Sequence, residues 1–347
     1  MDIAVVVNLH ARRGSQAVAR TCREHLPEAR VLASRSLDEA VGFARDLCDK
    51  PPSLLVSAGG DGTVVALLNA MRDADSSAFV RADDIASIST ARPPALGLLP
   101  LGTGNGWAHV TGAPRWRTGL EQLGHLAERG GALPLRRFDL IEAFGTVAHF
   151  AGTGWDAELI DDFHAQKTGL GVLPRRMRKG LAGYLQGLFT RMIPRHLVNP
   201  PVEVEITNTG DDAFTIDDEG RPVPLRGGEH GAVLYRGPAS VCGVGTTGEW
   251  GFGFRAFPFA EAMPRRFSLR IYGGRALEAT LRMSQLWRGA HPMPKMYNWL
   301  LTRCKAVFSR PVPFQMGGDR LGHKSEIDYA LAREQVDVLD WRAVATA

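Results

Sequence analysis

The sequence predicts a chain of two domains, an α/β domain followed by a strand-rich domain. In residues 1–135, short aliphatic runs alternate with helical patterns, as they do in βαβ units. After Leu135, strand-like pieces are separated by Gly and Pro and interrupted by one helical pattern. The length of 347 residues agrees with two domains, because a single hydrophobic core stops growing at about 250–300 residues.

The α/β part is predicted to begin with a buried strand and to alternate strands with helices. We expect strands at Ile3–Val7, Val31–Ala33, Leu54–Ser57 and Leu96–Pro100, and helices at Gln16–Leu26, Leu37–Cys48 and Thr63–Met71. The last two strands each lead directly into a glycine-rich loop. Between these loops, Asp73–Pro94 is polar and ends in two prolines, which predicts a long excursion over the surface.

The second part is predicted to consist of strands and one helix. The expected strands are Phe138–Phe144, Val147–Gly152, Val202–Thr207, Ala232–Arg236 and Phe267–Tyr272. The helix is Arg178–Met192, where apolar residues at helical spacing form one stripe. The polar stretch Asp211–Gly228 is expected to protrude as a hairpin or loop. We therefore expect domains at 1–135 and 136–327, with residues 328–347 free to pack back onto the first domain.

The composition excludes several classes of protein. A hydrophobic content of 44% and a charged content of 22% are those of a globular protein. The four cysteines lie far apart without a CxxC pair, which argues against a disulfide framework or a structural zinc site and favours a cytoplasmic location. No apolar run approaches the roughly 18–20 residues that span a bilayer, and the acidic N-terminus does not match a signal peptide. A net charge of +4 without a dense basic stripe gives no indication of nucleic-acid binding.

The first glycine loop is Gly59-Gly60-Asp61-Gly62-Thr63, which lies between an aliphatic strand and a helix. Glycine lets the backbone turn sharply and approach a bound group closely, and successive N–H groups at a helix N-terminus attract phosphates. A carboxylate among them would repel a phosphate unless Mg²⁺ or a ribose hydroxyl lay nearby. The string therefore predicts a nucleotide site, and the alternative is a tight structural turn.

The second glycine loop, Gly102-Thr103-Gly104-Asn105, also follows a strand and precedes a helical pattern. Thr103 and Asn105 offer hydrogen bonds to phosphate, ribose or base. In an open α/β sheet, ligands bind at the carboxyl edge where such loops converge. We expect the two loops to meet there, although a second structural turn is the alternative.

Together the two strings resemble the superfamily of diacylglycerol, sphingosine and ceramide kinases, which is more distantly similar to the NAD kinases. The resemblance continues at Asn8 in the family's first phosphate-proximal loop, at Gly154–Ala157 in its GFDA element, and at Gly180–Leu185 in its GxxxY helix. It implies a Rossmann-like α/β domain and an antiparallel β-sandwich domain. It also implies ATP and Mg²⁺ as cofactors and a lipid hydroxyl as acceptor.

The resemblance also implies roles for particular residues. ATP would be bound by Asn8, Gly59, Gly60, Asp61, Gly62, Thr63, Gly102, Thr103, Gly104 and Asn105. The metal would be held by Asp61 and Asp156, with a structural turn as the alternative role of Asp156. Catalysis would fall to Asp61 and to Asp319.

Several positions depart from the family pattern. The first loop has Asn8-Leu9 in place of Asn-Pro, and Arg12 and Arg13 stand before its only glycine, Gly14. Ala66 and Gly106 replace acidic residues that often occur in the family. The family's Asp-Gly-Glu appears as Gly317-Gly318-Asp319, so the residue that would help to activate the acceptor hydroxyl is a glycine. Asp319 lies two residues further along.

Three functions follow from these residues. The leading hypothesis is an ATP-dependent lipid kinase. A second is an NAD kinase, which is disfavoured because PLGTGN is the lipid-kinase form of the second loop. A third is a non-catalytic nucleotide or lipid sensor, which the replacements Gly317, Gly106 and Ala66 favour.

Two further features of the sequence concern what the protein binds besides a nucleotide. Basic residues flank the predicted helix Arg178–Met192, which suits docking on anionic lipid, although a helix packed on the second domain with a solvated basic rim is the alternative. The aromatic residues Trp155, Trp250, Phe252, Phe254, Phe257 and Phe259 would line an acyl-chain groove or pack in a core. The sequence leaves the oligomeric state open, a homodimer included.

Overall fold

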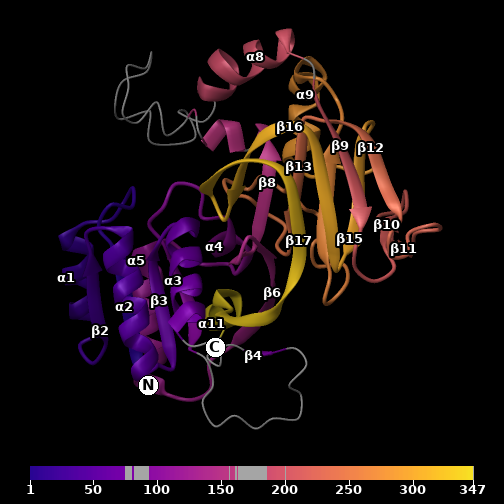
Figure 1. Cartoon of the computed structure of the whole chain (residues 1–347). Helices are drawn as coiled ribbons and strands as arrows, with labels where there is room; N and C mark the ends of the chain where they lie inside the picture. Colours follow the sequence, from indigo (N-terminus) through magenta and orange to yellow (C-terminus); the bar gives the residue numbers. More distant parts are fainter. Residues whose placement is uncertain are drawn as a thin grey trace. The chain divides into compact units, whose positions relative to one another are not determined.

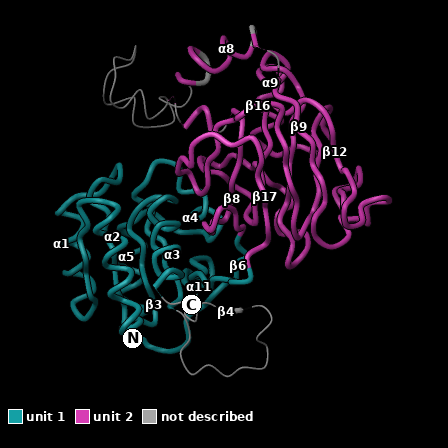
Figure 2. Tube along the Cα trace, viewed as in Figure 1, with its two compact units in different colours: residues 1–140, 333–347 teal, residues 141–332 magenta. Residues whose placement is uncertain are grey.

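The computed structural model of the protein describes residues 1–74, 80–81, 94–155, 157–160, 162, 186–199 and 201–346. The chain divides into two compact units, which are coloured separately in Figure 2. Unit 1 contains residues 1–140 and 333–347, and unit 2 contains residues 141–332. The chain therefore passes from unit 1 to unit 2 and returns, and the two crossing points lie within strands β6 and β17.

Unit 1 is built on a parallel sheet. Its strands are β1 (Ile3–Asn8), β2 (Arg30–Ser34), β3 (Leu54–Gly59), β4 (Val80–Arg81) and β5 (Ala95–Pro100), with parts of β6 (Leu135–Ala143) and β17 (Asp319–Leu339). β1 pairs in parallel with β2 and β3, and β3 pairs in parallel with β5. β3 and β5 are buried along their whole length, as expected for parallel strands covered on both faces.

Helices cover the two faces of this sheet (Figure 1). They are α1 (Gln16–His25), α2 (Leu37–Asp49), α3 (Asp61–Ala74), α4 (Gly106–Val110), α5 (Trp116–Arg129) and α11 (Trp341–Thr346). On one face, alternate residues of the strands pack with α1, α5 and Trp341 in a single core cluster. α2 and α3 pack beside each other. The C-terminal segment thus belongs to the core of unit 1, because Trp341 is buried there and its N–H donates to the carbonyl of Thr111.

Unit 2 is rich in antiparallel strands. They are β7 (Thr146–Ala148), β8 (Phe150–Gly154), β9 (Val202–Asn208), β10 (Phe214–Ile216), β11 (Pro222–Pro224), β12 (Val233–Ala239), β13 (Val241–Gly245), β14 (Phe267–Tyr272), β15 (Met296–Leu301) and β16 (Arg303–Met316). The register of β16 shifts between Val307 and Val312. Its first half pairs with β9 and its second half with β8, so one long strand serves two groups of strands.

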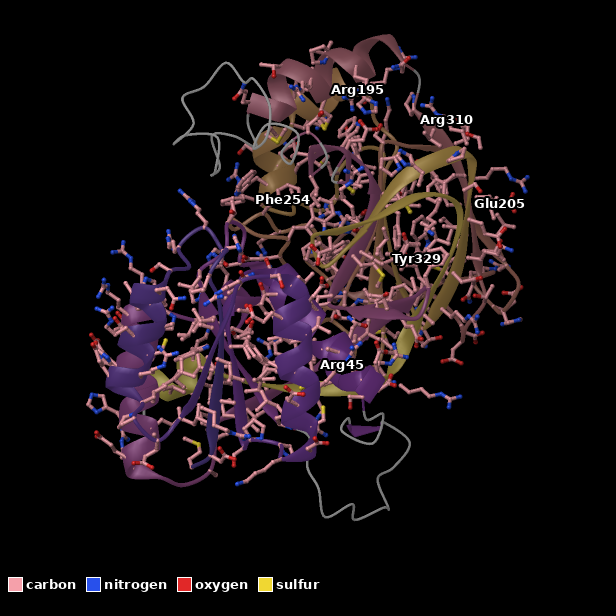
Figure 3. All side chains as sticks on the ribbon, turned by 60° about the vertical axis from the view of Figure 1, so that its left-hand side comes forward. Arg45, Arg195, Glu205, Phe254, Arg310 and Tyr329 are labelled. Atoms are coloured by element: carbon pink, nitrogen blue, oxygen red, sulfur yellow. The ribbon has the colours of Figure 1, made fainter. Side chains whose placement is uncertain are left out.

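The predicted protruding hairpin is confirmed, because β10 and β11 pair antiparallel within Asp211–Gly228. Three of the aromatic residues singled out above, Trp250, Phe254 and Phe257, pack with Phe150 in a buried cluster; Phe254 is labelled in Figure 3. The rings of Trp250 and Phe254 stack with centroids 5.4 Å apart. For these three aromatic residues, the structure therefore shows the second alternative given above, packing in a core.

Short helices accompany the strands of unit 2. They are a π-helical turn η3 (Leu188–Met192), α8 (Ile193–Val198), α9 (Ala276–Leu281) and α10 (Met283–Trp287). The predicted helix Arg178–Met192 lies mostly outside the described residues, together with the family-like segment Gly180–Leu185. Arg195 of α8, labelled in Figure 3, forms ion pairs with Glu158 and Asp162.

The predicted fold class is confirmed. A parallel α/β unit contains the N-terminal residues, and an antiparallel strand-rich unit follows it. No helix among the described residues is long and apolar enough to cross a membrane.

Candidate functional site

The candidate site of unit 1 lies where three parallel strands end. The register places Val7 of β1 opposite Ala58 of β3, and Gly59 of β3 opposite Pro100 of β5. The loops that follow these strands therefore start at the same edge of the sheet. This is the carboxyl edge, where open α/β sheets bind their ligands.

The two glycine loops contact each other through their backbones. A Cβ atom added to Gly102 would lie 2.4 Å from the Cα of Gly60, a distance that real Cβ atoms do not show. The carbonyl of Gly59 accepts hydrogen bonds from the N–H groups of Leu101 (2.9 Å) and Gly102 (3.0 Å). The sequence prediction that the two loops meet is thus confirmed, and the close approach requires glycine at position 102.

Asp61 joins the first loop to the helix that follows the second. Its carboxylate accepts the N–H of Gly106 at 2.9 Å and the N–H of Trp107 at 3.2 Å. These are the first two residues of α4, whose N–H groups have no acceptor within the helix. Asp61 therefore caps α4 from another part of the chain. Asn105, at the N-cap position itself, makes no capping bond and adopts the left-handed conformation with φ 54°.

The environment of Asp61 shifts its ionisation. Loss of hydration raises the pKa of this partly buried carboxyl above its ordinary value of 3.8. The hydrogen bonds from Gly106 and Trp107 and the charge of His109 act in the opposite direction without cancelling it. The folded protein therefore holds the Asp61 proton more tightly than the unfolded chain does.

The loop after β1 is tied to both glycine loops. The Nδ2 of Asn8 donates to Oγ1 of Thr63 at 2.9 Å, and the N–H of Arg13 donates to the carbonyl of Leu101 at 3.0 Å. Gly14 is required because a Cβ there would lie 2.0 Å from the carbonyl oxygen of Asn8. The chain thus holds three loops together and presents the exposed residues Arg12 and Arg13 beside them.

The first turn of α3 supplies donors for an anion. Thr63 and Val64 donate to the carbonyl of Gly60, whereas the N–H of Gly62 finds no acceptor among the described residues. In the second loop, Nδ2 of Asn105 donates to the carbonyl of Gly102 at 3.1 Å, and its buried Oδ1 has no partner in the part of the chain that the structure describes. These groups suit a phosphate and a polar ligand atom, respectively.

A dedicated metal cage is not found in the described residues, where no group of three or more His, Cys, Asp and Glu side chains could hold an ion. Mg²⁺ in phosphoryl-transfer sites is held mainly by phosphates and water, with one or two carboxylates. Asp61 fits that smaller role, because each of its oxygens uses one acceptor position for a backbone N–H and retains another.

The remaining candidate residues belong to unit 2. Asp156 lies outside the described residues. Asp319 is exposed at the start of β17 and pairs with Met316 across a two-residue turn made by Gly317 and Gly318. Both glycines have positive φ, 57° and 89°, which explains why glycine occupies them. Asp319 thus lies in unit 2, whereas the glycine loops belong to unit 1.

Two features of the site escaped the sequence interpretation. One is the capping of α4 by Asp61, and the other is the bond from Arg13 to Leu101 that fixes the first loop. The sequence contained no usable signal for this cap, because Asn105 is itself a residue type favoured at N-cap positions, and only its left-handed backbone shows that it does not cap α4.

We predict that Gly102→Ala destabilises the protein by more than about 2 kcal/mol, because its Cβ would collide with backbone that cannot move aside. The matched control is Gly42→Ala on α2, where nothing lies within 4 Å of the added atom. That substitution should stabilise the helix by about 0.5–1 kcal/mol. Urea denaturation measures both, and similar effects of the two substitutions would contradict the close approach.

We predict that Asp61→Asn lowers the free energy of unfolding by about 1 kcal/mol, because an amide offers one acceptor oxygen to two N–H groups. The loss should be larger near pH 4 than near pH 7. The pKa of Asp61 is raised on folding, so its favourable contribution is present at low pH and declines as the pH rises above 3.8. Denaturation of both proteins at several pH values measures the difference. The control Asp38→Asn, on an exposed carboxyl in the first turn of α2, should shift stability by under about 0.5 kcal/mol.

Solved structures share this fold at low sequence identity. The chain is similar to a diacylglycerol kinase from Bacillus anthracis str. Sterne, at 13% identity and a TM-score of 0.62, with 97% of this chain and 96% of the other covered. It is also similar to an NAD kinase from Archaeoglobus fulgidus in complex with ATP, at 14% identity and a TM-score of 0.50, with 98% and 93% covered. At these identities the likeness concerns the fold.

No curated protein matches the chain. The family model described as the diacylglycerol kinase catalytic domain matches residues 2–134, which include all three loops of the site. The resemblance inferred from the two glycine strings is therefore confirmed as a match of residues 2–134 to the model of the diacylglycerol kinase catalytic domain.

Proposed function

We propose that this protein is an ATP-dependent lipid kinase that transfers the γ-phosphoryl group of ATP to a hydroxyl of diacylglycerol or a related lipid. The observation that carries the proposal is the interlocking of Gly60 and Gly102 at the carboxyl edge of the parallel sheet, within a region that matches the kinase family. A nucleotide triphosphate suits this edge because backbone N–H groups there can approach phosphate oxygens without obstruction by side chains. We propose the cytoplasm as its location, since the four cysteines are free thiols.

The residues of unit 1 would bind and orient the nucleotide. The N–H of Gly62 and the positive end of α3 favour an anion at the first loop, and the exposed Arg12 and Arg13 add two positive charges that the glycine loops themselves lack. Asn8 holds Thr63, and Asp61 holds α4 in place. Mg²⁺ would enter with the phosphates and neutralise their charge, with Asp61 and Asp156 as its proposed protein carboxylates.

In the transfer step, the oxygen of the lipid hydroxyl bonds to the γ-phosphorus, the bond to the β–γ bridging oxygen breaks, and ADP leaves with the electron pair. The hydroxyl proton needs an acceptor. We propose Asp319, because it is an exposed carboxylate beside the position where the family has its aspartate. A positioned carboxylate of this kind contributes about 10²–10⁴-fold to the rate.

The proposal is tested by incubating the protein with radiolabelled ATP and Mg²⁺ and with diacylglycerol, a sphingoid base, an undecaprenol-type alcohol or NAD. We expect label in a lipid product. Label in NAD alone would replace the proposal with the NAD kinase function. No transfer to any acceptor by a folded protein would contradict the proposal.

A second candidate function is a non-catalytic nucleotide or lipid sensor. The two-residue turn favours it, because the backbone at Gly317 has φ 57° and the family's aspartate is absent there. In a sensor, ATP would bind to the loops of unit 1 without turnover.

Two substitutions separate these functions. If Asp319 is the base, Asp319→Asn lowers kcat by about 10²-fold or more, while the control Asp328→Asn, at another exposed carboxyl on β17, leaves kcat unchanged. Gly317→Asp restores a carboxylate at an αL position at a cost of about 1 kcal/mol. Turnover that appears only in Gly317→Asp, together with ATP binding by the unmodified protein, would establish the sensor.

A further inference from the structure

Helices α9 and α10 of unit 2 have an unusual distribution of apolar side chains. The small residues Ala276 and Ala279 of α9 are buried, each with 2% of its surface exposed. The large residues Leu277 and Leu281 are 58% and 80% exposed, and no other large hydrophobic residue among those described is as exposed as Leu281. A helix normally buries its large apolar side chains and exposes its small or polar ones. Here leucines four residues apart lie together on the outer face.

The inner face of α9 is firmly held. Its alanines belong to a buried cluster with Trp155, Tyr272 and Met293. Because the inner face of α9 is packed in this way, Leu277 and Leu281 cannot turn into the core. Their exposure is a property of the folded unit, and it calls for an apolar partner outside the chain.

The charges around the leucines are predominantly positive. Arg282 donates to the side chain of Gln285, and Arg288 donates to the backbone and hydroxyl oxygens of Ser284. Among the described residues, neither arginine forms an ion pair with a carboxylate. The single acidic residue of segment 275–288 is Glu278, and it pairs with Nζ of Lys295 at 2.7 Å. Arg275 is exposed at the start of α9. Three arginines and one lysine thus oppose one glutamate.

A hollow of about 570 Å³ lies between the leucine face and the arginines. It is lined by Glu278, Leu281, Arg282, Ser284, Gln285 and Arg288. Its lining combines guanidinium groups, a hydroxyl and an amide, which bind phosphate oxygens, with one apolar wall. The carboxylate of Glu278 also lines it and would repel a phosphate, but Lys295 pairs with this charge. A phospholipid headgroup carries the same combination of a phosphate and an adjoining hydrocarbon chain.

We propose that α9 and α10 form a docking surface for anionic membranes, in which Leu277 and Leu281 enter the boundary between headgroups and acyl chains and Arg275, Arg282 and Arg288 contact lipid phosphates. Protruding leucines rimmed by arginines are what an interfacial membrane contact requires. A folded protein partner is less well matched, since two leucines are small compared with the roughly 800 Å² that each side of a stable interface buries.

The test is sedimentation of the full-length protein with phosphatidylcholine vesicles that contain or lack phosphatidylglycerol, in the absence of ATP. We expect binding only to the anionic vesicles, and weaker binding at higher salt. The double variant Leu277→Ser/Leu281→Ser should reduce the bound fraction at least fivefold, as should Arg282→Gln/Arg288→Gln. The matched control is Val233→Ser/Val307→Ser, which removes apolar side chains of unit 2 that are 50% and 40% exposed elsewhere, and it should bind as the unmodified protein does.

Equal binding of the leucine variant and the unmodified protein would overturn the proposal, as would equal binding to neutral vesicles. Loss of a dimer in the leucine variant without loss of vesicle binding would assign the surface to a second copy of the chain and would also overturn it. Because vesicle binding is measured without ATP, it does not depend on the proposed kinase activity. Phosphoryl transfer to a short-chain, water-soluble diacylglycerol separates the docking proposal from the proposed kinase function. This acceptor needs no membrane, so the leucine variant should phosphorylate it as the unmodified protein does.

Discussion

The backbone contact between Gly60 and Gly102 is the constraint on which the site of unit 1 depends. Two loops from different strands can approach so closely only because position 102 carries no Cβ atom, and a Cβ at position 60 would lie a tight 3.2 Å from the Cα of Gly102. This contact sets the spacing of the ends of β3 and β5, and it places Asp61 where its carboxylate reaches the first turn of α4. The capping bonds and the glycine contact therefore stabilise the same arrangement of the two glycine loops and α4.

This constraint changes the interpretation of the carboxylate in the first glycine loop. Asp61 has a structural task that is visible in its hydrogen bonds, whether or not it also meets a metal. A substitution at Asp61 will affect folding as well as any chemistry, so a loss of activity alone does not identify a catalytic role. Stability has to be measured on the same variant.

Unit 2 contains the features that concern an acceptor. Its β16–β17 turn carries Gly317 and Gly318 in conformations that favour glycine, with Asp319 next in the chain. Its α9 exposes leucines beside arginines whose hydrogen bonds go to neutral groups, such as the bond from Arg282 to Gln285. A lipid kinase has to take its acceptor from a membrane, and a surface that binds anionic lipid would raise the local concentration of that acceptor. The leucine surface and the glycine loops are thus complementary parts of one proposed function, although each is argued from its own unit.

The sequence by itself determined the local elements and the position of the glycine loops. Strands such as Leu54–Ser57 and Phe267–Tyr272 were predictable because their apolar patterns are contiguous, and the loops were predictable because glycine next to a strand end has few other uses. The tertiary structure decided which distant groups meet: Asp61 with Gly106, Asn8 with Thr63, and Trp341 with the core of unit 1. It also decided that α9 turns its alanines inward, where they pack in the cluster that contains Trp155 and Tyr272. The physical reason is that local patterns act between neighbours in the chain, whereas these contacts depend on strand register and on packing across the fold.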